Sequence, residues 1–134
     1  MDVFISSGLR GTGCLERNLK VRQTLAEAGI SSFLPQEELP IDIGLSAQTI
    51  FAGNLSALRA CRCCVFLPEG AGEGAFLEAG IVVGFGKPII VLSQYPASHF
   101  GKMMEGLLFE TNARQTSDLD CLPHLVRTLC DVQT

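Results

Sequence analysis

The 134-residue sequence lacks the features that mark several classes of protein. It has no tryptophan and one tyrosine, only 18% of its residues are charged, and its net charge is −4. No basic cluster is present, which argues against a nucleic-acid duplex or an anionic membrane as the main partner. A small phosphate stays possible, because one arginine can hold it.

Targeting segments are missing as well. No apolar run approaches the roughly 20 residues that a membrane-spanning helix needs. Residues 1–5 lack the basic start of a secretion signal and lead directly into an apolar stretch. The sequence therefore predicts a cytoplasmic protein.

Cofactor motifs are equally scarce. The six cysteines contain only one close group, at residues 61–64, and no second pair with zinc-like spacing. Cys63 and Cys64 lead into an apolar run, so we interpret them as packing residues. Gly84 to Lys87 lacks the spacing of a phosphate loop and precedes a predicted strand, not a helix. We therefore expect no metal and no other cofactor.

Apolar residues, in contrast, make up 47% of the chain, enough for one domain over residues 1–134. Short apolar runs predict strands at residues 3–6, 30–34, 63–67 and 88–92, the last of them central. Helical spacing predicts helices at residues 15–26, 47–59, 75–85 and 119–129. In the first helix, Leu15, Leu19 and Ala26 share one face. Residues 36–44 are predicted as loop, and residues 103–109 as a short helix with a fifth strand.

Uninterrupted apolar strands separated by helices are typical of a parallel sheet that is covered on both faces. The pattern predicts a doubly wound, mostly parallel, five-stranded α/β sheet of the flavodoxin or Rossmann type. Ligands bind such sheets at the carboxyl ends of the strands. That rule selects the loops at residues 6–13, 35–44 and 68–74.

The strongest local pattern is Gly-Ala-Phe-Leu-Glu-Ala-Gly at residues 74–80, followed by Gly-Lys-Pro at residues 86–88. It sets Glu78 in the first turns of a helix, where the helix dipole favours the ionised carboxylate. Such a carboxylate can attack an electron-poor carbon or stabilise an oxocarbenium-like centre. From spacing alone, an ordinary exposed helix residue is the simpler interpretation.

The segment at residues 63–92 resembles the signature of the nucleoside 2-deoxyribosyltransferase superfamily. The shared pattern is an apolar strand, a Gly-rich loop, Gly-x-x-x-Glu-x-Gly, Gly-Lys-Pro and a second apolar strand. The resemblance implies that Glu78 attacks the anomeric carbon of a nucleoside or nucleoside 5′-monophosphate. Cleavage of the N-glycosidic bond would then pass through a covalent glycosyl-enzyme, by hydrolysis or base exchange. It also implies a homo-oligomer, a dimer or higher, because a dimer interface often completes the pocket in this family.

The first loop is similar to the substrate loop of the nucleoside 5′-monophosphate N-glycosidase branch. There, loop amides and an arginine hold the 5′-phosphate, and consecutive N–H groups can form such an anion nest. The similarity implies substrate-binding roles for five residues: Ser7, Gly8, Leu9, Arg10 and Gly11. A plain surface turn with a solvated Arg10 is the alternative.

Other positions match the family less closely. Asn54 stands where the family has an acidic residue that positions the sugar and handles a proton. An amide can bond a hydroxyl but cannot accept a proton. Gly72 stands where the family has Asp or Ser. With Gly74 it is expected to face the substrate, although Glu69 and Glu73 would repel a phosphate.

Gln36, at the tip of the second strand, is predicted to contact the base edge, with a solvent-facing role as the alternative. Several functions stay open at this point. Arg10 slightly favours a nucleotide hydrolase over a transferase. The amide at Asn54 motivates a non-catalytic nucleotide sensor of the same fold. A response-regulator-like module is disfavoured, because no acidic pair follows the first strand.

Overall fold

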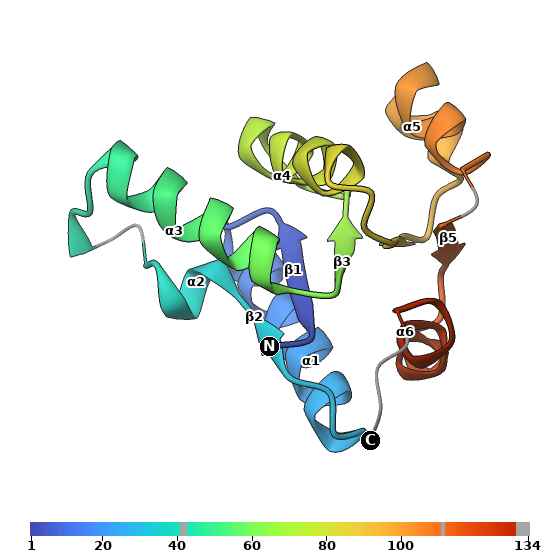
Figure 1. Cartoon of the computed structure of the whole chain (residues 1–134), viewed down its shortest axis with the longest axis horizontal. Coiled ribbons are helices and arrows are strands. Elements are labelled where there is room, and N and C mark those ends of the chain that lie inside the picture. Colours follow the sequence, from blue (N-terminus) through green and yellow to red (C-terminus); the bar gives the residue numbers. More distant parts are fainter. Residues whose placement is uncertain (41–42, 111, 131–134) are drawn as a thin grey trace.

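A computed structural model describes residues 1–40, 43–110 and 112–130 (Figure 1). Its centre is a parallel sheet of five strands: β1 (Val3–Ser7), β2 (Ser32–Phe33), β3 (Cys63–Leu67), β4 (Ile89–Leu92) and β5 (Ala113–Thr116). The strand order is β2-β1-β3-β4-β5. The predicted parallel five-stranded sheet is therefore confirmed. The central strand is β3, however, and the expectation that residues 88–92 form it was wrong.

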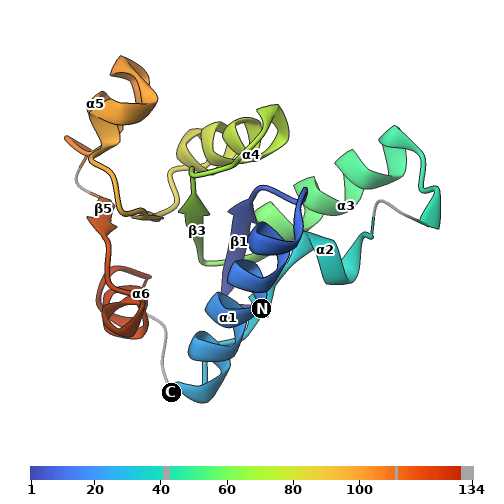
Figure 2. The same cartoon turned by 180° about the vertical axis from the view of Figure 1, so that it is seen from behind.

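Helices cover both faces of this sheet. They are α1 (Thr12–Glu27), α2 (Pro35–Glu38), α3 (Ala47–Ala60), α4 (Glu73–Gly84), α5 (Lys102–Leu107) and α6 (Leu122–Cys130). Figure 1 shows α3 and α4 on one side of the strands and α1 and α6 on the other, and Figure 2 shows the same two layers from behind. None of the described helices is long and apolar enough to cross a membrane.

Two hydrophobic cores follow from the alternation of side chains along each strand. Val3 and Ile5 of β1 pack with Leu25 of α1 and Val126 of α6. Phe4, between them, belongs to the opposite core with Leu58 of α3 and Val82 of α4. The interior strands β3 and β4 are apolar at every position because both of their faces are buried, and β1 is apolar up to Ser6.

Three local predictions were wrong, each for a physical reason. The fifth strand lies at residues 113–116, outside the predicted segment, because this edge strand reads Ala-Arg-Gln-Thr and has no apolar run. The predicted loop at residues 36–44 begins with the short helix α2, started by Pro35 in its first turn. In α1, the face that contacts the core carries Val21 and Leu25, and it differs from the predicted face, on which Leu19 is 43% exposed.

The candidate active site

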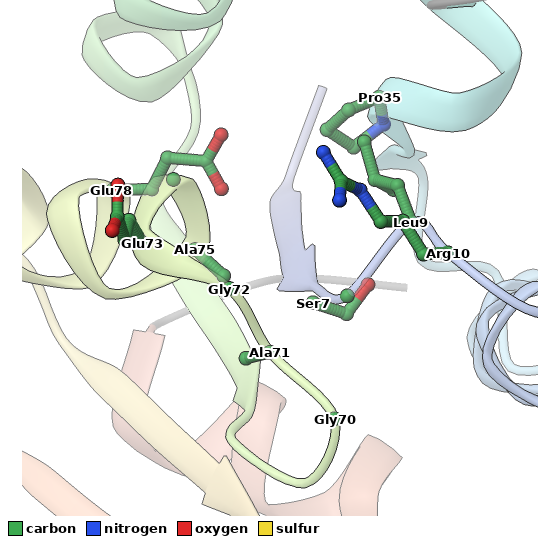
Figure 3. Close-up of a pocket in the computed structure, with 12 residues that line it drawn as sticks. Ser7, Leu9, Arg10, Pro35, Gly70, Ala71, Gly72, Glu73, Ala75 and Glu78 are labelled. Atoms are coloured by element: carbon green, nitrogen blue, oxygen red, sulfur yellow. The ribbon is translucent and has the colours of Figure 1, made fainter.

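A cavity of about 610 Å³ opens at the carboxyl ends of β1 and β3. The chain leaves β1 toward β2 on one side and later returns to β3 on the other, so the strand order reverses between β1 and β3. Such a reversal leaves a crevice, which is where open α/β sheets bind their ligands. One wall of the cavity is the loop after β1, and the other is the loop after β3 with the first turns of α4 (Figure 3).

Glu78 projects from α4 into this cavity, partly buried. Its Oε1 atom accepts a hydrogen bond of 2.7 Å from the Ser6 hydroxyl of β1. Burial raises the pKa of Glu78 from 4.5 to about 7, and the Ser6 hydrogen bond opposes this rise. A carboxyl whose pKa lies near neutrality is typical of a catalytic site, and it contradicts the simpler interpretation of Glu78 as an ordinary exposed residue.

Arg10 reaches into the cavity from the opposite wall. Its side chain is exposed, and Figure 3 shows its guanidinium and the Glu78 carboxylate pointing toward one another across the gap. Glu73 also lines the cavity. Glu69 does not, because its Oε1 atom bonds the Ser93 hydroxyl and the backbone N–H of Gln94 at the end of β4. The charged lining is therefore one arginine and two glutamates.

The two walls of the cavity are in contact through the backbones of Gly8 and Gly70. A Cβ atom added at Gly8 would lie 2.3 Å from the carbonyl oxygen of Gly70, so no larger residue fits at position 8. Gly70 itself has a positive φ of 74°. Asn18 of α1 is fully buried beneath this contact, and its Nδ2 atom donates to the Gly8 carbonyl at 3.0 Å. This hydrogen bond from Asn18 holds the loop after β1 in position.

Asn54 lies beside the main cavity and does not line it. It contributes, with Phe51 and Leu77, to a side cavity of about 110 Å³ that also reaches Glu78. The Oδ1 atom of Asn54 is buried, with no hydrogen-bond partner among the described residues. An unpaired buried acceptor costs free energy, so Asn54 is an exception among the buried polar groups of the described residues.

The structure brings seven of the predicted site residues together around one cavity: Ser7, Gly8, Leu9, Arg10, Gly72, Gly74 and Glu78. Gly11 does not line it and leads into α1. Gln36 is turned toward α1. Its Oε1 atom accepts from Asn18 at 2.9 Å, and its Nε2 atom donates to the Leu15 carbonyl at 3.3 Å.

Sequence reasoning missed Ser6 and Asn18. Ser6 sits inside an apolar strand, and Asn18 lies on the buried face of α1 with Val21 and Leu25. A polar residue within an apolar stripe was the available signal in both cases. Ser7 lines the cavity as a residue, and its buried hydroxyl lacks a hydrogen-bond partner among the described residues.

The described residues contain no group of three His, Cys, Asp or Glu side chains that could hold a metal ion. Cys61, Cys63 and Cys64 are buried and free, in agreement with a packing role. The polar and charged groups at the cavity are therefore those of Glu73, Glu78, Ser7 and Arg10, together with the loop amides.

Residues 13–117 match the family model of the nucleoside 2-deoxyribosyltransferases. The chain belongs to the nucleoside 2-deoxyribosyltransferase family. The match begins in α1 and includes the cavity wall formed by the loop after β3 and by α4, and it confirms the resemblance that the sequence around Glu78 indicated. Among curated proteins, none matches the sequence of this chain.

Solved structures share the fold of this deoxyribosyltransferase-family chain at low identity. A conserved protein from Enterococcus faecalis V583 superposes with a TM-score of 0.78 at 16% identity, covering 96% of this chain and 98% of its own. A 2-deoxyribosyltransferase from Bacillus psychrosaccharolyticus gives 0.71 at 18% identity, with 92% and 90% covered. A 2-desoxiribosyltransferase from Leishmania mexicana gives 0.57 at 18% identity, with 74% and 69% covered. At these identities the likeness concerns the fold alone.

Proposed function

We propose that this protein cleaves the N-glycosidic bond of a deoxynucleoside or nucleoside 5′-monophosphate, with Glu78 as its nucleophile. The observation that carries the proposal is the Glu78 carboxyl, partly buried at the switch point of the sheet and facing a cavity of about 610 Å³. Membership in the deoxyribosyltransferase family supports the choice of a glycosyl group over other electrophiles.

The reaction has two steps. One Glu78 oxygen attacks the anomeric carbon while the carbon–nitrogen bond breaks, and the bonding electron pair leaves with the base, which takes a proton from solvent. Water, or a nitrogen of a second base, then attacks the same carbon. The carbon–oxygen bond to Glu78 breaks, the carboxylate is regenerated, and the attacking group loses its proton to solvent.

Two unpaired polar atoms on either side of Glu78 support a bound sugar. Ser7 lines the main cavity and Asn54 the side cavity, and the Oγ atom of the first and the Oδ1 atom of the second are buried without a hydrogen-bond partner among the described residues. Sugar hydroxyls donate and accept hydrogen bonds, so they would satisfy both atoms. Gln36, with both ends of its amide engaged by α1, is better suited to hold the loop than to read the base.

Replacement of the nucleophile tests the proposal directly. Glu78→Gln keeps the size of the side chain, and it should lower the rate at which free base is released from the substrate by about a thousandfold or more. The matched control is Glu16→Gln, which removes an exposed carboxylate on α1 and should keep the parent rate. Base release by folded Glu78→Gln protein at the parent rate would exclude Glu78 as the nucleophile.

Products decide between hydrolysis and transfer. The parent protein is incubated with deoxynucleosides and with nucleoside 5′-monophosphates, each with and without a free acceptor base, and products are separated by chromatography. A new nucleoside that forms only with the acceptor identifies base exchange. Free sugar or sugar phosphate identifies hydrolysis, which Arg10 favours because its charge can hold a phosphate.

A second candidate is a non-catalytic nucleotide-binding protein of the same fold. Asn54 favours this candidate, because the family has an acidic residue at that position and an amide cannot replace it in proton transfer. This candidate predicts calorimetric binding of nucleotides without base release over hours. Base release that depends on Glu78 would exclude it.

We also propose a homo-oligomer, formed through the outer faces of α3, α4 and α5. Large apolar side chains are exposed there, including Phe51 at 50%, Val83 at 41% and Met103 at 91%. Phe51 also lines the side cavity next to Glu78, so this surface is continuous with the candidate site. A helix such as α4, whose outer face carries exposed apolar side chains, normally has a partner on that face.

Val83→Glu tests this interface, with Leu19→Glu on α1 as the control, because Leu19 is exposed to a similar extent, 43%. The first variant should shift the parent protein toward monomer in sedimentation experiments, and the second should not. A monomeric parent protein would contradict the proposal. The cytoplasmic location and the single domain over residues 1–134 stay predictions from the sequence.

A further inference from the structure

Ser6 makes an unusual pair of contacts beneath Glu78. Its Oγ atom lies 2.7 Å from the Oε1 atom of Glu78 and 3.0 Å from the backbone carbonyl oxygen of Ala75, one turn earlier in α4. Both distances are those of good hydrogen bonds. A serine hydroxyl carries a single proton, and a carbonyl can only accept. The hydroxyl can therefore donate to only one of the two oxygens at a time.

The protonation state of Glu78 decides which oxygen receives the proton. When Glu78 is ionised, the Ser6 hydroxyl donates to its Oε1 atom. When Glu78 is protonated, Glu78 donates to Ser6, and the hydroxyl turns to donate to the Ala75 carbonyl. Only the hydroxyl proton rotates between these arrangements, and no heavy atom has to move.

The surroundings of Ser6 keep it in this position. It is fully buried in β1, and β1 is paired with the central strand β3, where Ser6 lies opposite Phe66. No water can replace a hydroxyl that is 0% exposed without a change in packing. A group on an interior strand is held more rigidly than one on a loop, which suits a residue that orients a reacting side chain.

We propose that Ser6 is a positioning residue that binds the Oε1 atom of Glu78 throughout the reaction and so leaves the Oε2 atom to attack the anomeric carbon. This inference rests on the function proposed above. In the first step the bond from Oε2 to carbon forms as the carbon–nitrogen bond breaks. Oε1 then becomes the carbonyl oxygen of the ester and still accepts from Ser6. Ser6 keeps its own proton in both steps.

Other groups near Glu78 do not fill this role. Arg10 and Glu73 line the same cavity from the opposite wall and from the start of α4, and both are exposed. Asn54 faces Glu78 from α3 across the side cavity and is uncharged. Cys64 of β3 is fully buried, and burial, with a further contribution from Glu78, raises the pKa of its thiol well above 9, so it stays neutral.

Ser6→Ala tests the proposal without relying on catalysis. The variant loses a hydrogen bond to the ionised form of Glu78, so the pKa of Glu78 should rise by about one unit. The shift is measured in the folded, ligand-free protein by NMR titration of ¹³C-labelled glutamate carboxyls. The Glu78 signal is identified by its absence in Glu78→Gln.

Kinetics supply the second measurement. If only ionised Glu78 attacks, the acid limb of the pH profile of kcat/KM should move upward by the same one unit in Ser6→Ala, giving roughly tenfold lower kcat/KM on that limb. The matched control is Ser32→Ala, which removes another buried strand hydroxyl, on β2, whose Oγ atom has no partner among the described residues. It should change neither the titration nor the profile.

Ser6→Cys covers the case in which the alanine variant does not fold. A thiol has nearly the same shape and is a weaker donor, so the same shift should appear with smaller size. An unchanged Glu78 titration in a folded Ser6 variant would overturn the proposal. Absence of base release in the parent protein would instead count against the proposed function, and the NMR titration would still decide the Ser6 contact.

Discussion

The two walls of the cavity contribute different properties. The β1 wall, residues 7–10, offers backbone, one buried hydroxyl and an exposed arginine, and Asn18 holds it from below. The α4 wall, residues 70–78, offers two carboxyls, of which Glu78 is partly buried and has a raised pKa. The first wall is suited to binding and the second to reaction. The comparison predicts that substitutions on the two walls will change different measured quantities.

The largest expected effect is on stability, and it comes from the α4 wall. The pKa of Glu78 is about 7 in the folded protein, compared with an ordinary value of 4.5 that applies to the unfolded chain. Between pH 4.5 and pH 7, Glu78 is therefore protonated in the folded state and ionised in the unfolded state. The free energy of unfolding should therefore fall as pH rises through this window. Above pH 7 the ionised, buried carboxylate costs about 3 kcal/mol, which Glu78→Gln should recover.

Denaturant titrations of the parent protein and Glu78→Gln across this pH range measure the difference. The two proteins should be about equally stable below pH 4.5, and the variant should be more stable above pH 7. A gain in Glu78→Gln that is independent of pH would mean that burial does not perturb this carboxyl.

The second effect concerns the packing of the β1 wall. In Gly8→Ala the new methyl group would meet the Gly70 carbonyl at 2.3 Å, and neither backbone segment can yield without moving its wall. We expect a loss of about 2 kcal/mol in the free energy of unfolding. Gly13→Ala is the control, because a Cβ atom there meets nothing within 4 Å. Equal stability of the two variants would show that the walls do not need this contact.

The sequence identified residues on both walls but not the contacts that hold the walls in place, and the reason is physical. A carboxylate between glycines at the start of a helix leaves a local pattern, and the resemblance of residues 63–92 to the family signature then marked Glu78 as the candidate nucleophile. The contacts that shape the β1 wall join residues far apart in the chain, such as Gly8 with Gly70. No spacing rule records such a contact.

The same distinction explains the fold. Interior strands such as β3 and β4 are apolar on both faces and were predicted, whereas the edge strand β5 carries Arg114 and Gln115 and was displaced in the prediction. Ser6 was overlooked because a single hydroxyl in an apolar strand resembles ordinary packing. Only its 2.7 Å contact with Glu78, 72 residues away, distinguishes it.

The smallest expected effect tests whether the β1 wall binds a phosphate. Arg10→Ala should raise the KM for a nucleoside 5′-monophosphate by about tenfold, the loss of one charge-assisted hydrogen bond, or about 1.5 kcal/mol. The KM for the matching deoxynucleoside should stay unchanged in the same variant, because that substrate has no phosphate. For the nucleoside 5′-monophosphate, the KM of Arg10→Lys should lie between those of the parent protein and Arg10→Ala. Lysine keeps the positive charge but cannot form the two parallel hydrogen bonds of a guanidinium. Equal losses for both substrates would mean that Arg10 contacts the sugar or the base, and the division of the cavity into a binding wall and a reacting wall would then need a different basis.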